Sequence, residues 1–169
     1  CTSMQVDRNY VDTHGQSEVA FAFCHLLGFQ LMPRFKNLHS QKLSLPDEKL
    51  AAKLGNLKWI LQDVIDWDQI EQEYDEMVKY ATALRLGTAE TEAILKRFTR
   101  NNHQHPTFKA FSELGRVIKT IFLCNYLMNE DVRIEIHEGL NVVENWNSAN
   151  GFIFYGNRGE ISSNDVDAQ

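Results

Sequence analysis

Two acidic side chains in this sequence stand where carboxylates could hold a metal ion. Asp12 follows a short apolar run and precedes Thr13, His14 and Gly15, a pattern typical of a strand that delivers an acid into a turn. Glu144 continues the apolar side of a predicted helix, among asparagines that have poor helical propensity. Carboxylate oxygens suit Mg²⁺, and a pair of such ions can drive phosphodiester displacement. Asp12 and Glu144 are therefore the candidate catalytic and metal-binding residues, but this class of site generally uses a third acid on an adjacent strand, and the residues before Asp12 offer none at a suitable spacing.

Each acid also has a structural interpretation. Turns favour Asp for local reasons, and Glu144 could be a structural acid paired with a cation. If the two carboxylates converge on metal ions, we expect a gap of roughly 4 to 8 Å between their nearest oxygens. His103 and His105 could ligate a metal by themselves, but no third soft ligand lies near them in the sequence.

The elements that must position Asp12 form the opening of the chain. Residues 4–11 favour a strand, and Ser17 stands where the N-cap of a helix belongs. Residues 18–27 are apolar almost all round, which predicts a fully buried helix, and residues 29–32 favour a second strand. This order predicts two parallel strands joined by a right-handed crossover, with Asp12 at the carboxyl end, where such sheets place their chemistry.

A basic cluster follows the second predicted strand, and it is the only one in the first half of the chain. It consists of Arg34, Lys36, His39 and Lys42. The cluster could be a solvated loop or a surface that contacts phosphate groups. Arg34 and Lys36 leave the strand on the same edge as Asp12, so they could hold a phosphodiester backbone next to the two acids.

From residue 48 to about 126 the periodicity is helical, with short breaks. Asp47 is placed to start the first helix, Gly87 ends a second, residues 89–98 favour a third, and Thr107 is the expected N-cap of a fourth. Asn129 would cap the last helix, which carries Glu144. The residues expected to face the core are Leu50, Leu54, Leu57, Leu61, Val64, Ile65, Ile70, Tyr74, Met77, Val78, Ala81, Phe111, Leu114, Ile118, Ile121, Phe122, Val132, Ile136, Leu140 and Val143.

The bulk composition limits the possibilities. A chain of 169 residues with 43% hydrophobic residues is long enough for one core and one domain. No apolar run approaches the roughly 20 residues of a membrane span. Cys24 and Cys124 lie in apolar helical contexts, which predicts buried free thiols in a reducing cytoplasm. The net charge of −6 excludes a protein that coats nucleic acid non-specifically, so any nucleic-acid contact must be local.

Several short motifs resemble one protein family, and they occur in the family's order. The chain resembles the C-terminal catalytic (DDE) region of the large bacterial transposases of replicative class II transposons, the Tn-three family, from residue 10 to about residue 160. The matching stretches are YVDTHG (10–15), LLGF (26–29) with PR (33–34), WD (67–68), LRLG (84–87), LGR (114–116) with KT (119–120) and FL (122–123), and GLN (139–141) with Glu144.

The resemblance implies an α/β fold with a ribonuclease-H-like core, incomplete in this sequence, and a predominantly helical insertion between the second and third catalytic acids. Residues 1–45 would contribute a strand, a helix and a strand to the core, and residues 46–105 would be the helical insertion. Residues 106–161 would be helices that return to the core with the third acid, and residues 162–169 would be a tail.

The resemblance also implies the chemistry of the site. Asp12 matches the second catalytic acid and Glu144 the third, and the complete site would hold two Mg²⁺ ions. The enzyme would cleave transposon ends and join their 3′ ends to target DNA. Its partners would be the terminal inverted repeats, the target DNA and other copies of itself. It would act in the bacterial cytoplasm and would not associate with a membrane. The side chains expected to contact DNA are Arg34, Lys36, His14, Arg116 and Lys119.

Two departures from the family pattern qualify this expectation. The family's first catalytic Asp lies upstream of the residues present here, which implies a fragment that is inactive alone. Many relatives carry Lys and Gly before the third acid and a basic residue after it, whereas Val142, Val143 and Asn145 stand here. The alternatives are a non-catalytic remnant that serves as a helical interaction module, and a ribonuclease-H-like nuclease that uses water as its nucleophile.

Overall fold

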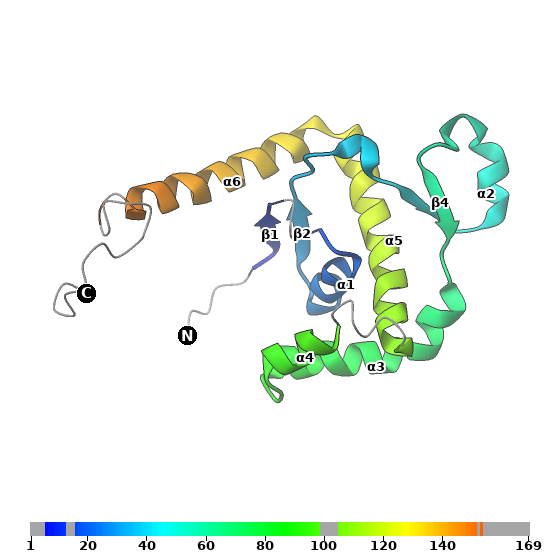
Figure 1. Ribbon diagram of the computed structural model, residues 1–169, viewed down its shortest axis with the longest axis horizontal. Helices are drawn as coiled ribbons and strands as arrows, with labels where there is room; N and C mark the ends of the chain where they lie inside the picture. The colour runs from blue at the N-terminus through cyan, green and yellow to red at the C-terminus, as the bar shows by residue number, and fades with distance from the viewer. Residues whose placement is uncertain (1–5, 13–15, 99–104, 152, 154–169) are drawn as a thin grey trace.

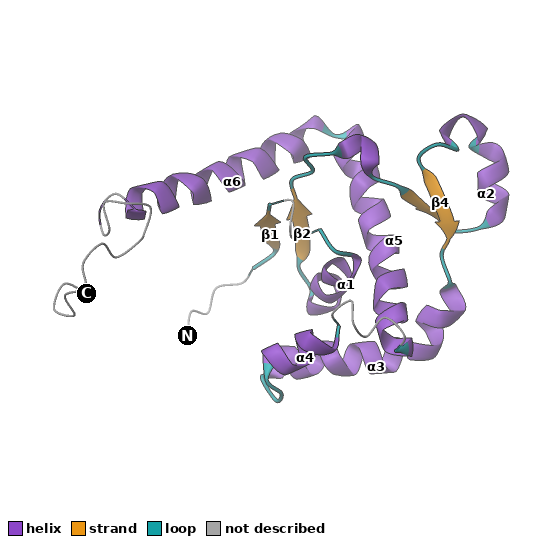
Figure 2. Cartoon of the chain, in the orientation of Figure 1, coloured by secondary structure: helices purple, strands orange, loops and turns teal. Residues whose placement is uncertain are grey.

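A computed structural model describes residues 6–12, 16–98, 105–151 and 153, which form mostly helices with two small parallel sheets (Figures 1 and 2). The α-helices are longest in the second half of the chain. The elements in chain order are β1 (Arg8–Val11), α1 (Glu18–Leu27), β2 (Gln30–Pro33), the 3₁₀ turn η2 (Leu38–Ser40), β3 (Leu43–Leu45), α2 (Glu48–Lys53), the 3₁₀ turn η3 (Gly55–Leu57), β4 (Leu61–Val64), α3 (Trp67–Leu86), α4 (Thr91–Arg97), α5 (Pro106–Met128) and α6 (Glu130–Asn150).

The predicted opening of strand, helix and strand is confirmed. β1 and β2 pair in parallel, with Val11 opposite Pro33. The Ser17 hydroxyl accepts a hydrogen bond from the Ala20 amide at 3.2 Å and so caps α1. Gly28 ends the helix at a φ of 88°, a conformation that side chains with a Cβ rarely adopt. The chain therefore turns sharply from α1 into β2, as a crossover between parallel neighbours requires.

The continuous helical periodicity predicted through residues 61–65 is wrong, because residues 61–64 form the strand β4. β4 pairs in parallel with β3, and the register shifts between its two paired positions. The spacing of Leu61, Val64 and Ile65 fits a helix, but a short apolar run after a turn fits a strand equally well. The region predicted as a helical insertion therefore carries one strand of a second small sheet, and α2 is short.

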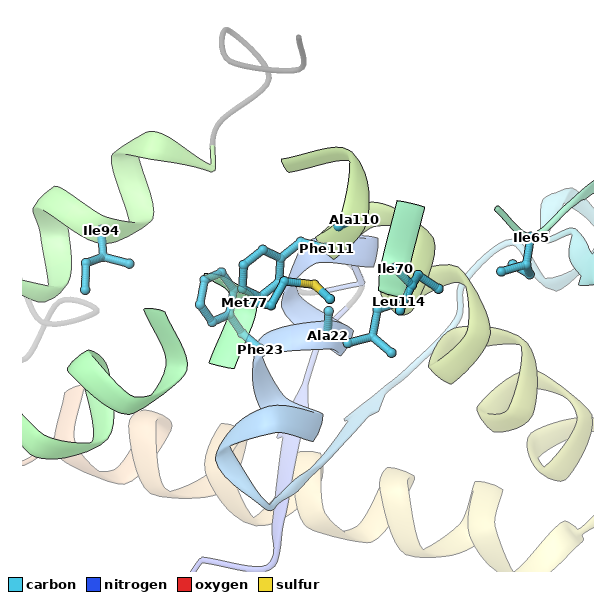
Figure 3. Packing of buried hydrophobic residues seen from close by; sticks show 9 residues of the cluster. All are labelled: Ala22, Phe23, Ile65, Ile70, Met77, Ile94, Ala110, Phe111 and Leu114. Carbon is cyan, nitrogen blue, oxygen red and sulfur yellow. The ribbon is translucent and has the colours of Figure 1, made fainter. Parts of the chain in front are cut away.

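The main core forms where α5 packs against α1 and α3. Phe23 of α1 stacks on Phe111 of α5 with ring centroids 4.2 Å apart, and Met77 of α3 is fully buried beside them (Figure 3). Figure 3 also shows Ala22 and Leu114 in the same cluster, between α1 and α5. α5 is thus the central element on which the strands and the other helices are arranged.

Several local predictions fail at the edges of these helices. His105, not Thr107, caps α5, because its Nδ1 accepts from the Thr107 amide at 3.3 Å. The Thr107 hydroxyl is buried and donates instead to Glu73 at 2.8 Å. α4 begins at Thr91 rather than at residue 89, and α1 is not fully buried, since His25 is exposed.

The predicted apolar stripes are buried only where another element covers them. Met77, Leu114 and Ile136 are buried as expected, as are several others of their stripes. Cys24 is buried as predicted, whereas Cys124 is exposed on the outer side of α5. The residues predicted in the core that are instead exposed are Leu57, Tyr74, Val78, Ile121 and Val143.

α6 leaves the end of α5 and runs past β1 and β2, and its C-terminal half extends beyond them (Figure 1). Val132, Ile136 and Leu140 bury one side of its first half against residues of β2 and α5. Past Leu140 the helix has exposed apolar side chains, including Trp146, which is 67% exposed. Glu144 therefore stands on the part of α6 that the core does not cover.

Within the residues described, no helix is long and apolar enough to cross a membrane. The mixture of helices and small parallel sheets is compatible with the predicted α/β class. The ribonuclease-H-like topology itself stays a prediction, since the described strands form two separate pairs rather than one larger sheet.

The contact between α1 and α5 generates a first testable prediction. A Cβ added to Gly115 would lie 1.9 Å from the backbone oxygen of Glu18, so G115A must push the two helices apart. We expect it to lower the free energy of unfolding by about 3 kcal/mol or more, measured by urea denaturation. G55A is the matched control, because a Cβ there meets no atom within 4 Å. Equal stability of G115A and the unmodified chain would contradict this packing.

Candidate active site

Asp12 lies immediately beyond the end of β1, and its position is fixed by the pairing of β1 with β2. The Arg34 amide donates to the Val11 carbonyl oxygen at 3.0 Å, which extends the parallel ladder by one residue. Asp12 and Arg34 therefore leave the two strands side by side at the carboxyl edge of the sheet, as the sequence predicted. This edge is where a parallel sheet presents functional side chains.

One guanidinium joins the two predicted catalytic acids. Nη2 of Arg34 lies 3.4 Å from Oδ1 of Asp12 and 3.5 Å from Oε1 of Glu144. Since one nitrogen contacts both, these oxygens lie at most about 7 Å apart, which is below the upper limit of the range predicted for a bridged pair of acids. Lys36 completes the cluster, with Nζ 3.5 Å from Oδ2 of Asp12. The predicted convergence of Asp12 and Glu144 is thus present.

The cluster is open to solvent, and this sets how much it contributes to stability. The Asp12 side chain is 45% exposed and that of Glu144 65%, while Arg34 between them is 27% exposed. Ion pairs at such a surface contribute little to folding. A site that is exposed, charged and held at a sheet edge is accessible to a large substrate such as a duplex.

α6 is held against β1 by a polar contact. The Tyr10 hydroxyl donates to Oε1 of Glu135 at 2.5 Å, and Arg8 forms an ion pair with the same carboxylate. The hydrogen bond from Tyr10, which has the larger effect, and the contact with Arg8 hold the pKa of Glu135 below its usual range. One helical turn further on, a Cβ added to Gly139 would lie 2.9 Å from the Tyr10 ring. The contact with Tyr10 and Glu135 thereby fixes where α6 crosses β1, and so where Glu144 stands.

Sequence reasoning did not single out Tyr10, Glu135 or Gly139 as determinants of the site. A signal was present, because a lone Gly inside a helical pattern often marks a close approach by another element. The partner of Gly139 could not be read from the chain, since Tyr10 lies more than a hundred residues away.

The other predicted DNA-binding residues have different surroundings. Arg116 is used within the fold: its guanidinium pairs with Glu113 at 2.6 Å and donates to the Asp63 carbonyl oxygen at 2.8 Å. Lys119, one turn along α5, is half-buried, and burial lowers the pKa of its ammonium. Neither side chain joins the cluster around Arg34. His14 lies outside the described residues.

The donor set at Asp12 and Glu144 is suited to a hard divalent cation. Both acids offer carboxylate oxygens, and the Arg34 guanidinium stands between them where a positive charge is favoured. Mg²⁺ sites commonly use only one or two protein carboxylates together with substrate phosphate. Among the described residues, no group of three His, Cys, Asp or Glu side chains could hold a metal. Of the two histidines considered as ligands in the sequence, His105 caps α5 and His103 lies in the part that is not described.

Comparison with known proteins gives a consistent family. The model of the Tn3 transposase DDE domain matches residues 1–169. The chain is 32% identical to the transposase for transposon Tn1546 of Enterococcus faecium over 168 residues, which are 99% of this chain and 17% of that protein. It is 30% identical to the transposase for transposon Tn21 of Escherichia coli, again over 99% of this chain and 17% of that protein. It is 32% identical to the transposase for transposon gamma-delta of Escherichia coli (strain K12), over 89% of this chain and 15% of that protein.

The chain spans less than a fifth of the length of these relatives. No solved structure matches it.

The contact between Tyr10 and Glu135 predicts a pH dependence. Because the pKa of Glu135 is lowered on folding, its contribution to stability is fully present above the ordinary carboxyl pKa and is lost as the pH falls through the lowered value. Y10F removes the main cause, so we expect the pKa of Glu135 to rise toward its usual range in an NMR titration. The contribution to overall stability should be small, since solvent screens the pair.

The matched control is Y74F, which removes the hydroxyl of an exposed Tyr on α3. It should leave the titration of Glu135 unchanged. A Glu135 titration that is the same in Y10F and in the unmodified chain would show that α6 is not held at this point.

Proposed function

The chain belongs to the Tn3 transposase DDE domain family, as its motifs predicted, and on that premise we propose that it supplies two of the metal-binding carboxylates of a DNA transposase. That enzyme would cleave transposon ends and join their 3′ ends to target DNA by transesterification. The observation that supports the proposal is the convergence of Asp12 and Glu144 on one cationic group at the carboxyl edge of a parallel sheet. The core would be ribonuclease-H-like, with Asp12 as the second acid of the family and Glu144 as the third.

In this proposal Asp12 and Glu144 hold divalent metal, with Mg²⁺ as the expected ion. When bound, the metal would supply activation of the attacking oxygen and stabilisation of the leaving oxygen. The two carboxylates come from elements that are far apart in the chain, so folding itself assembles the ligand set. Their exposure leaves room for a scissile phosphate between them and solvent.

Arg34 and Lys36 have a second role in this proposal. Both cations are paired with Asp12 in the structure, and both are within reach of a backbone phosphate that approaches the same edge. A guanidinium released from the carboxylates binds a phosphate oxygen well, because its donors match that geometry. The two side chains would thus hold the DNA backbone beside the two acids, in an assembly with other copies of the protein.

The sharpest test is E144Q in the complete transposase. The change preserves size and helix propensity but removes the charge that a metal needs, so end cleavage and strand transfer should both fall by about a hundredfold or more. Stability should change by less than about 1 kcal/mol, because Glu144 is exposed. E138Q, at an exposed site on the same helix, is the control and should keep full activity.

Melting temperature and strand transfer should be measured on one preparation. If E144Q loses stability but keeps normal activity per folded molecule, Glu144 is a structural acid and the catalytic assignment is wrong. Hydrolysis of ends without any joining to target DNA would favour the nuclease alternative.

A separate test addresses the phosphate contacts. Replacing Arg34 and Lys36 by Ala in the complete transposase should weaken DNA binding across sequences, and the slope of log affinity against log salt should shrink by about one unit per lost contact. The control replaces Lys49 and Lys53, two lysines of α2, in the same way. If the salt dependence of the first variant is unchanged, Arg34 and Lys36 belong to a solvated loop and do not contact DNA phosphates.

A further inference from the structure

A small polar cavity lies between the start of α1, strand β3 and the middle of α5, apart from the cluster around Arg34. Its volume is about 120 Å³. At one side of it the Gln41 side-chain amide donates to Oε1 of Gln16 at 3.4 Å. Polar and charged side chains line it throughout: Glu18, Ser40, Gln41, Lys42, Ser44, Gln62, Arg116, Lys119 and Thr120.

Two hydroxyl groups in the cavity accept hydrogen bonds but donate none to the described residues. The buried Ser44 hydroxyl accepts from Gln62 at 3.1 Å and from Arg116 at 3.2 Å. The Thr120 hydroxyl accepts from the Ser44 amide at 3.0 Å. A hydroxyl oxygen whose lone pairs are engaged keeps its own hydrogen to donate. Ser44 and Thr120 therefore offer two donors that await an acceptor.

Lys119 adds a positive charge that forms no ion pair with a described residue, although the charge of Glu18 acts on it from a greater distance. Its ammonium is half-buried, and within the described chain no acceptor or carboxylate lies at hydrogen-bond or ion-pair distance from it. Burial lowers its pKa, and the charge of Glu18, which lies beyond ion-pair distance, offsets this only in part. The other two cations of the cavity are engaged, Arg116 with Glu113 and Lys42 with the Trp59 carbonyl oxygen at 2.6 Å.

Among the described residues, Glu18 is the single acid that lines the cavity. Burial raises the pKa of its carboxyl, the nearby charges of Lys119 and Arg116 oppose this rise, and no ion pair with either cation forms. Of the three cations that line the cavity, Arg116 is paired with Glu113, so Lys42 and Lys119 face one carboxylate whose charged form burial disfavours. The cavity favours an anion, and its size suits a group with one central atom and four oxygens.

We propose that this cavity binds one phosphate group, with Lys119 as its counter-charge and the Ser44 and Thr120 hydroxyls as donors to its oxygens. The phosphate could be a diester of a nucleic-acid backbone or free phosphate, and both present the same oxyanion to these donors. The proposal goes beyond the role of Asp12 and Glu144 in metal binding and does not depend on it.

The test is an NMR titration of the full chain at constant ionic strength, with orthophosphate in one series and dimethyl phosphate in another. We expect saturable amide shifts at Ser44, Lys119 and Thr120. K119M should weaken binding by about tenfold or more, because it removes the charge-assisted hydrogen bond. E18Q should strengthen binding, because it removes the one negative charge among the described residues that line the cavity.

The matched control is K109M, at an exposed site on the same helix, and it should bind phosphate as the unmodified chain does. Shifts produced by dimethyl phosphate identify a backbone diester as the ligand, and shifts produced only by orthophosphate identify free phosphate. If neither compound binds, or if binding is equal in K119M and the unmodified chain, the proposal is wrong. Should K119M fail to fold, an E18Q chain that does not gain affinity overturns it.

Discussion

The close approach of α5 to α1 is the constraint on which the rest of the structure depends. At Gly115 the two helix backbones touch, because no side chain separates them, and this brings Phe111 onto Phe23. α5 then buries Leu123 on its other half against β2 and carries α6 at its end. A change at this contact would shift the core, the sheet edge and α6 together.

Two contacts between the packed elements position the candidate site. Parallel pairing of β1 and β2 places Asp12 beside Arg34, and the contact of Tyr10 with Glu135 places α6 across β1. Neither of these contacts involves the charged side chains of the site. The site is an exposed cluster of charges that contributes little to folding, whereas the elements that position it are buried and well packed. Such a division lets the charges meet a substrate without disturbing the fold.

The sequence predicted the parts of the fold that local chemistry determines. Ser17 and Asn129 cap helices as expected, and the parallel strands around α1 followed from the order of elements. β4 was missed because Leu61 and Val64 fit both periodicities, and only pairing with β3 decides between them. The convergence of Asp12 and Glu144 could be predicted from their places, but the guanidinium between them could not, since it depends on strand register. Burial of Val143 was predicted wrongly because periodicity does not show where a core ends.

Past Leu140, no side chain of α6 is buried against the rest of the described structure. The last buried side chain of α6 is Leu140, and Glu144 lies four residues further on, about 6 Å along the axis. A tilt of about ten degrees at that support would move the carboxylate by about 1 Å, which is a large error for a metal ligand. Val142, Val143 and Trp146 are exposed on this segment, so a contact made there would change the tilt of α6 and the position of Glu144. The separation of Asp12 and Glu144 thus depends on the tilt of α6, which is set outside the cluster of charges.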